Sequence, residues 1–172
     1  MALWLLVRRR RARSPEAQLK AASHGLLENF LIPDGDGGEI HLDYAVLGSD
    51  SIMVLDLRDI EGHVFGSNAM QDWTVIADQR RFTFSNPQPA LYDRVAAVKR
   101  LLPDVPVQGM IVFGARADFS KGRPGHVMMF DELLTELRNA KREQPLSPLL
   151  ADAWANLQRE AVAAQVGQLM RG

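Results

Sequence analysis

The order strand, helix, strand in the middle of the chain most strongly constrains its fold. The region 86–102 is predicted to be a helix, because apolar residues recur there at helical spacing and a proline follows. The apolar run 107–113 comes after a short loop and is predicted to be a strand in the sheet interior, reached by a crossover. Region 39–57 precedes them and reads as an antiparallel hairpin. The sheet is therefore predicted to be mixed, with both parallel and antiparallel pairs.

The remaining elements complete an α/β fold in which helices flank this mixed β-sheet. Ser14-Pro15 and Ser147-Pro148 each have the cap-and-proline pattern of a helix start, and Asp131 is expected to cap a third helix. The last helix carries apolar residues at helical spacing, so we expect it to dock on the domain, with pairing to another protein as the alternative. Further strands are predicted at 26–32, 62–65, 72–76, 81–84 and 126–129.

Composition limits the classes of function. The 172 residues are 47% hydrophobic and 24% charged, which suits one soluble globular domain with tails. The net charge of -1 gives no overall attraction to a polyanion, so binding of nucleic acid would need a local basic patch or a bound metal. The chain has no cysteine, which excludes disulfides, thiolate zinc sites and a cysteine nucleophile. A cytoplasmic location is the default expectation.

The amino terminus leaves two interpretations open. The apolar run 2–7 is far shorter than the ~20 residues of a membrane span, and five arginines follow it between residues 8 and 13. This order is typical of a disordered basic tail, but also of the end of a membrane helix with its positive flank. We therefore predict three parts: a basic tail or membrane-proximal stub at 1–13, a folded domain at 14–140, and a C-terminal helix at 141–172.

Two carboxylates on the predicted hairpin are the candidates for chemistry. Asp43 lies on the first strand and Asp56 on the second, and Arg58 follows two residues later on the face of Asp56. Acids that converge from neighbouring strands can hold a divalent cation such as Mg²⁺. The alternative is a structural pair in which Arg58 simply neutralises an acid.

Other residues near these acids are secondary candidates. Glu39 and His41 share a face with Asp43 by alternation, so either can supply a third ligand or a general base; the alternative for His41 is a partly exposed strand residue. Trp73 and Phe84 can stack on nucleic-acid bases, although core packing is favoured for both.

These landmarks together resemble the NERD (nuclease-related) domain, a member of the PD-(D/E)XK nuclease superfamily. Leu42-Asp43 is similar to the family's Ile-Asp, and the strand into Asp56-Leu57-Arg58 is similar to its Glu-x-Lys strand. Gly62 falls four residues after the cation, Trp73 matches a tryptophan further on, and Asn86-Pro87 matches the family's helix start. The resemblance runs from about Leu26 to Asn139. It implies a restriction-endonuclease-like core and a metal-dependent phosphodiesterase site.

The departures from the family fall on its active-site motif. Asp56 stands where the family has Glu, and Arg58 stands where it has Lys. Ala90 stands where the family has Gln, with Gln88 nearby as an accessory candidate, and Glu16 is the only candidate for the acid of the family's first helix. Arginine stays protonated at any ordinary pH, so its side chain cannot share a proton with the attacking water. It can, however, bind phosphate through two parallel hydrogen bonds.

Two functions follow from the resemblance. The first is a catalytically impaired relative that binds nucleic acid or another protein in connection with DNA processing. The second is an active nuclease that uses Mg²⁺ or Mn²⁺, with Asp43 and Asp56 as metal ligands and Arg58 on the phosphate. A protein partner on the C-terminal helix and membrane contact by the amino terminus are further expectations.

Overall fold

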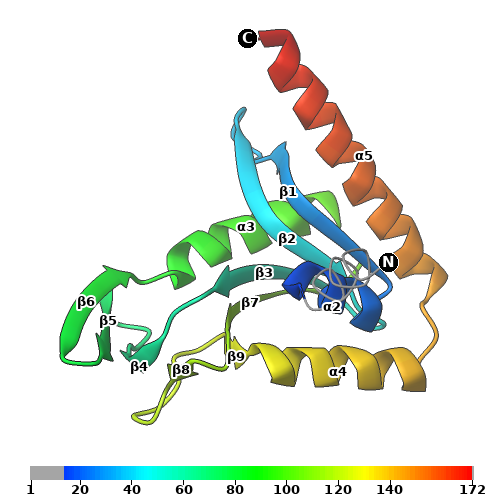
Figure 1. The fold of residues 1–172 in the computed structure, drawn as a ribbon. Coiled ribbons are helices and arrows are strands. Elements are labelled where there is room, and N and C mark those ends of the chain that lie inside the picture. The colour runs from blue at the N-terminus through cyan, green and yellow to red at the C-terminus, as the bar shows by residue number, and fades with distance from the viewer. Residues whose placement is uncertain (1–13, 172) are drawn as a thin grey trace, which may run out of the picture.

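The computed structural model describes residues 14–171, and these form two β-sheets and four helices (Figure 1). The expected α/β class, with a mixed sheet flanked by helices and a C-terminal helix, is confirmed. The predictions for residues 1–13 lie outside the described residues. Across the larger sheet the strands are β1 (Gly25–Pro33), β2 (Glu39–Leu47), β3 (Ile52–Arg58), β7 (Val107–Phe113) and β9 (Val127–Met129).

The crossover predicted from the sequence builds the centre of this sheet. Strands β1, β2 and β3 pair antiparallel, as a hairpin and its neighbour should. Helix α3 (Gln88–Leu101) then leads to β7, which pairs parallel with β3 from Ile52–Val107 to Arg58–Phe113. Strand β9 covers only the end of β7, also in parallel. The apolar run 107–113 is therefore interior, as predicted.

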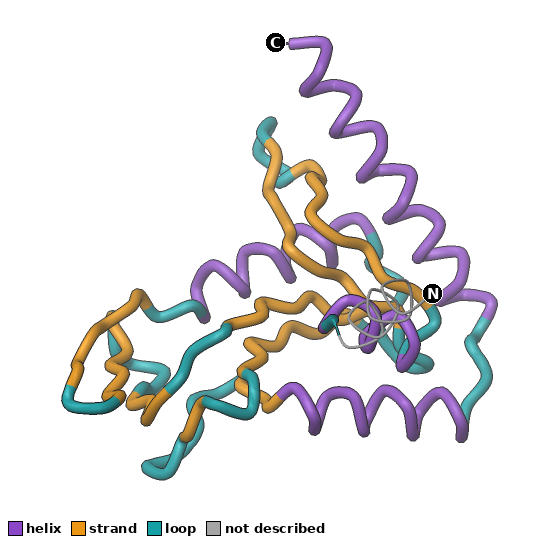
Figure 2. The backbone as a smooth tube through the Cα atoms, in the orientation of Figure 1, coloured by secondary structure: helices purple, strands orange, loops and turns teal. Residues whose placement is uncertain are grey.

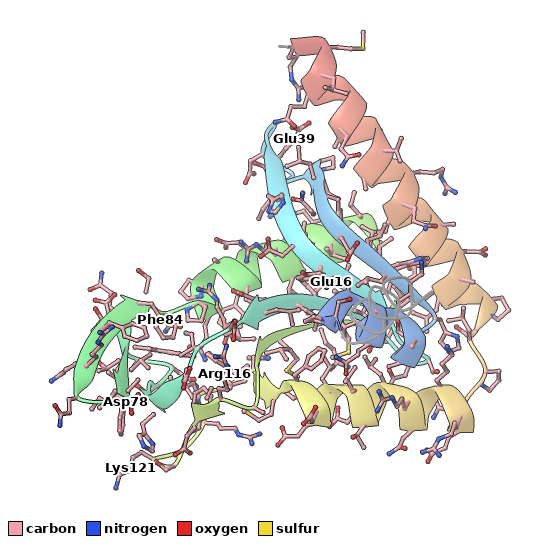
Figure 3. The ribbon with its side chains drawn as sticks, in the orientation of Figure 1. Glu16, Glu39, Asp78, Phe84, Arg116 and Lys121 are labelled. Carbon is pink, nitrogen blue, oxygen red and sulfur yellow. The ribbon has the colours of Figure 1, made fainter. Side chains whose placement is uncertain are left out.

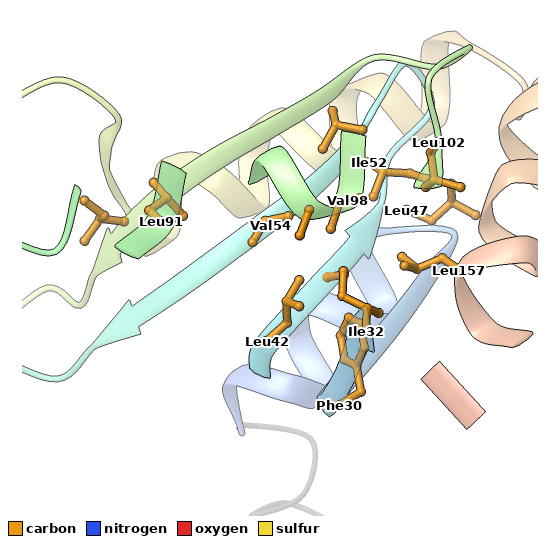
Figure 4. Close-up of a cluster of buried hydrophobic side chains, with 14 of the residues drawn as sticks. Phe30, Ile32, Leu42, Leu47, Ile52, Val54, Leu91, Val98, Leu102 and Leu157 are labelled. Atoms are coloured by element: carbon orange, nitrogen blue, oxygen red, sulfur yellow. The ribbon is translucent and has the colours of Figure 1, made fainter. Parts of the chain in front are cut away.

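Helices cover both faces of the larger sheet. Helices α3 and α5 (Pro148–Arg171) pack on one face, where the cluster shown in Figure 4 includes Leu42, Val54, Leu91 and Leu157. Helices α2 (Pro15–Ala22) and α4 (Phe130–Glu143) pack on the other face, in a second cluster. The strands are buried on both faces, which explains why β3 and β7 read as nearly continuous apolar runs.

The helix starts follow the expected chemistry at two of three places. The Ser14 hydroxyl accepts a hydrogen bond from the Ala17 backbone N–H at 3.1 Å, which caps α2. The Ser147 hydroxyl accepts from the Leu150 N–H at 3.2 Å in the same way. The prediction that Asp131 caps α4 was wrong. The N-cap of that helix is Met129, two residues earlier, and the Glu132 carboxylate in its first turn accepts from the Met129 N–H.

The strands after the hairpin form a separate sheet, which the sequence did not indicate. Its order is β6 (Arg80–Ser85), β5 (Asp72–Ala77), β4 (Gly62–Phe65) and β8 (Ala117–Asp118). Asp78 and Gln79, with φ of 45° and 66°, make the tight turn expected between β5 and β6. This small sheet projects to one side of the molecule, beyond the ends of β3 and α3 (Figures 1 and 2).

Helix α5 docks on the domain, as the sequence predicted. Leu150, Trp154 and Leu157 are buried in the cluster under α3 and α5. The Trp154 indole packs so closely on Gly25 that a Cβ there would lie 2.9 Å from the indole nitrogen. None of the helices within residues 14–171 is long and apolar enough to cross a membrane. Binding of a protein partner to α5 remains a prediction.

Candidate functional site

The predicted site residues Asp56 and Arg58 contact each other directly at the end of β3. Arg58 donates from Nε to Asp56 Oδ1 at 2.8 Å and from Nη2 to Oδ2 at 2.9 Å, a bidentate pair. The two residues share a face because they are two apart in a strand. Asp56 is only 3% exposed, whereas the Arg58 side chain is 35% exposed. Both carboxylate oxygens are thus engaged by one guanidinium group.

A second arginine, which sequence reasoning missed, reaches the same carboxylate. Arg94 lies on α3, and its Nη1 is 3.9 Å from Asp56 Oδ2. Its Nε donates to the backbone carbonyl of His41 on β2 at 3.0 Å. The signal that could have found it is its spacing: it follows Ala90 by four residues, one helical turn along the same face.

The strand pairing explains why α3 can reach this point. The pairing of β2 with β3 ends at Tyr44 and Leu55, one residue before Asp56. On its other edge, β3 stays paired with β7 as far as Arg58. The ladder between β2 and β3 therefore stops short of Asp56, and Arg94 contacts both strands there, through the Asp56 carboxylate and the His41 carbonyl.

Asp43 lies where the regular alternation of β2 is interrupted. Leu42 and Ala45, an odd number of residues apart, both belong to the cluster under α3. On the neighbouring strand β1, Asn29 lies opposite Asp43, between two residues that pair with β2. The φ of Asn29 is 47°, a left-handed conformation. The period-two argument therefore fails locally. Within residues 14–171, the ion pair of Asp43 is with His41 Nδ1 at 3.6 Å, and no hydrogen bond or ion pair joins Asp43 to Asp56.

The accessory candidates Glu39 and His41 have other partners. Glu39 lies at the outer end of β2, about 13 Å along the strand from Asp43 at the usual rise per residue. There its carboxylate accepts from Arg171 Nη2 at 2.8 Å, near the end of α5 (Figure 3). His41 Nε2 contacts the Asn29 side-chain oxygen. Neither residue contacts Asp56 through its side chain in the described part of the chain.

Gln88, the third accessory candidate, joins α3 to two loops. It is buried, and its side-chain nitrogen donates to the Asn68 side-chain oxygen and the Gly125 carbonyl, each at 2.8 Å. Its backbone N–H donates to the Asn86 side-chain oxygen at 2.9 Å. The Asn86-Pro87 start of α3 thus fixes the loops before β5 and β9. These contacts give Gln88 a role in the fold.

Glu16 lies in a different part of the molecule from Asp56. Tyr44 donates its hydroxyl to Glu16 at 2.6 Å, and Tyr44 packs with the cluster under α2 and α4. This hydrogen bond lowers the pKa of Glu16 and raises the pKa of Tyr44 to about 12. The bond ties α2 to β2 on the face away from α3.

Aromatic side chains of the small sheet lie beside Arg58. Trp73 is fully buried and meets Phe84 edge to face, with ring centroids 5.9 Å apart. The guanidinium carbon of Arg58 lies 5.9 Å from the centroid of Phe84, within cation–π range. Phe84, labelled in Figure 3, is thus the link between the small sheet and the end of β3. Core packing, the favoured interpretation of Trp73, is what the structure shows.

The residues present do not fit a Mg²⁺ ion in this arrangement. Mg²⁺ needs several oxygen ligands in an octahedron. Asp56 offers both oxygens to a guanidinium instead, with a second guanidinium nearby. No group of three or more His, Cys, Asp or Glu side chains between residues 14 and 171 is placed to hold a metal ion. The roles of Asp43 and Asp56 as metal ligands stay predictions, and they require Arg58 to leave Asp56.

Comparison with protein families decides the broader identity. The family model described as "nuclease-related domain" matches residues 8–114, more than half of the chain. The chain belongs to the nuclease-related domain (NERD) family. This family is of the PD-(D/E)XK type, as the resemblance implied. A nuclease-related function therefore follows at the level of the domain.

A curated relative matches about two thirds of this chain. It is an uncharacterized protein of Bacillus anthracis, 21% identical over 122 residues, which cover 68% of this chain. The match spans 58% of the relative's length. No solved structure matches the chain.

The landmarks that identified the NERD domain prove to serve its scaffold. Gly62 has φ of +128°, and a Cβ there would lie 2.7 Å from the Ile76 carbonyl oxygen. Trp73 donates its indole N–H to the Ser67 carbonyl at 3.1 Å.

Proposed function

We propose that this protein is a catalytically impaired NERD-domain protein that binds the phosphate backbone of nucleic acid through Arg58 and Arg94. The observation that carries the proposal is the bidentate pair between Arg58 and Asp56, with Arg94 beside it. A carboxylate held in this way is a poor metal ligand but a good anchor for a guanidinium group. The proposal therefore favours binding over hydrolysis.

The chemistry of arginine supports phosphate as the ligand. A guanidinium group has five N–H donors in a planar fork that matches phosphate geometry. Arg58 gives two of these bonds to Asp56, and Arg94 gives one to the His41 carbonyl. The remaining N–H groups of Arg58 belong to a side chain that is one-third exposed. Asp56 would then fix the orientation of Arg58, much as a supporting residue orients a ligand-binding group.

The first experiment separates binding from cleavage. The purified protein is incubated with single- and double-stranded DNA in Mg²⁺ or Mn²⁺, beside an Asp43→Ala/Asp56→Ala control. We expect no cleavage by either protein. Cleavage by the wild type that the control lacks would overturn the impaired reading and favour the active nuclease.

The second experiment tests the arginines. Arg58→Gln and Arg94→Gln should each weaken binding of a labelled oligonucleotide in EDTA. Arg138→Gln is the matched control, because it removes the same charge from an exposed position on α4, on the other face of the sheet. Equal losses in all three variants would mean that only bulk charge matters, and would refute a site at Arg58.

A complementary variant restores the family's residues. Asp56→Glu/Arg58→Lys supplies the longer acid and a cation that can exchange a proton. If this variant gains metal-dependent cleavage, the two substitutions alone account for the impairment. If it gains neither metal binding nor cleavage, the site has lost more than two side chains.

A further inference from the structure

Strand β6 presents an unusually exposed edge next to Arg58. It is the outer strand of the small sheet, and its residues Arg80 to Thr83 are all exposed. Alternation divides the strand into two faces, with Arg80, Phe82 and Phe84 on one and Arg81 and Thr83 on the other. The first face of β6 therefore carries two aromatic rings, and the second face carries none.

The aromatic face of β6 leads directly to the proposed phosphate site. Phe84 pairs with Trp73 across the strands and carries Arg58 over its ring. Phe82 is the next residue on that face, opposite the buried Val75, yet it is 46% exposed. Successive residues on one face of a strand are about 6.7 Å apart. Arg80, Phe82 and Phe84 thus share one face of β6, and Arg58 lies over the Phe84 ring; these four residues are called the β6 row from here on.

The charge of the β6 row suits a polyanion. It carries two guanidinium groups, of which Arg58 is paired with Asp56, and the acids of the β5–β6 hairpin lie off the row. Asp72 falls on the opposite face by alternation, and Asp78 is in the turn. The row therefore combines positive ends with apolar rings between them.

We propose that the β6 row binds a single-stranded nucleic acid, with a base stacked on Phe82 and phosphates at Arg80 and Arg58. This rests on the proposed function and specifies its substrate class. Aromatic rings interleaved with cations bind single strands without sequence preference, because every base has a face to stack. In a duplex the base faces are covered by their neighbours. Phe84 already packs on Trp73 and Arg58, so Phe82 is the ring with room for a base.

The test compares two residues of the β6 row, Phe82 and Arg80, each with a partner on the opposite face of the β5–β6 hairpin. Phe82→Ala is matched by Ile76→Ala, which removes a 39% exposed apolar side chain from β5. Arg80→Ala is matched by Arg81→Ala, the neighbouring arginine on β6 with the same charge. The probes are labelled oligothymidylate, oligouridylate and a DNA hairpin duplex, followed by fluorescence anisotropy in EDTA over a range of salt. Circular dichroism checks that each variant stays folded.

The β6 row predicts unequal effects within each pair. Phe82→Ala should weaken single-strand binding on the order of tenfold, since stacking of one base is worth about that much, and Ile76→Ala should leave it unchanged. Arg80→Ala should reduce the slope of log affinity against log salt by about 0.7, the value for one phosphate contact on a single strand, and Arg81→Ala should not. The duplex should bind more weakly than either single strand.

The outcomes distinguish failure of the β6 row from failure of the proposed phosphate site at Arg58. If the wild type binds and Arg58→Gln weakens binding, but the paired variants behave alike, the phosphate site stands and the β6 row is refuted. Tighter binding of the duplex would also refute it. If the wild type binds no nucleic acid, the proposed function fails, and the row with it.

Discussion

Replacing Arg58 by glutamine should destabilise the fold, because it leaves the buried Asp56 carboxylate without its bidentate partner. The two N–O distances of 2.8 and 2.9 Å give a large gross attraction. Coulomb's law at an effective dielectric constant of 20 yields about 6 kcal/mol at such a distance. Most of this offsets the cost of removing the two charges from water.

The net loss of folding free energy on breaking the Arg58–Asp56 pair lies between two known limits. Breaking a fully buried pair costs roughly 3 to 5 kcal/mol, and breaking an exposed one costs about 0 to 1 kcal/mol. Asp56 is buried, Arg58 is 35% exposed, and Arg94 remains 3.9 Å away to compensate in part. We therefore expect Arg58→Gln to lower the free energy of unfolding by about 2 kcal/mol. In a chain of this length that lowers Tm by roughly 4 to 8 °C.

A double-mutant cycle isolates the pair. Urea unfolding of the wild type, Arg58→Gln, Asp56→Asn and the double variant gives the coupling free energy between the two residues. We expect a coupling of about 1.5 kcal/mol or more, with the double variant more stable than the sum of the single losses implies. A coupling below about 0.5 kcal/mol, as in exposed pairs, would refute the reasoning that Arg58 neutralises a buried carboxylate.

Three further predictions concern the scaffold. Gln88→Met should cost about 1 to 3 kcal/mol in urea unfolding, because the buried side chain loses its hydrogen bonds to the Asn68 oxygen and the Gly125 carbonyl; an unchanged midpoint would contradict this role. Gly62→Ala should cost more than about 2 kcal/mol, since φ is +128° and the new Cβ meets a carbonyl oxygen; a wild-type Tm would contradict it. Tyr44→Phe should cost about 1 kcal/mol at pH 7, measured by urea unfolding against pH. Because the folded pKa of Tyr44 is raised to about 12, this difference should be full below pH 10 and fade as pH rises toward 12. Because the pKa of Glu16 is lowered, the difference should also fade in acid, below its ordinary value of 4.5; a difference independent of pH would refute the link.

Much of the fold could be predicted because its signals are local. A serine followed by proline gives a helix start through a side-chain hydrogen bond within four residues, as at Ser14 and Ser147. The strand–helix–strand order fixes a parallel neighbour by chain geometry alone. The division into two sheets was not predicted, because it depends on where the chain turns away after β3. No local pattern records that choice.

The site was predictable only in part. Asp56 and Arg58 are two apart on one strand, so their shared face follows from period two. Arg94 was missed because it approaches from α3, which follows β4, β5 and β6 in the sequence and lies 36 residues beyond Arg58. Asp43 keeps the neighbour that alternation predicts for it, since His41 Nδ1 lies 3.6 Å away, but the alternation of β2 breaks between Leu42 and Ala45.

By itself, the sequence indicated the family, the mixed sheet and the shared face of Asp56 and Arg58, because each is set by residue type and short spacing. Tertiary structure alone decided that Arg94 reaches Asp56 and that Arg58 lies over the ring of Phe84 on β6. These depend on distances between segments far apart in the chain. Such distances are fixed only when the two sheets and α3 pack together.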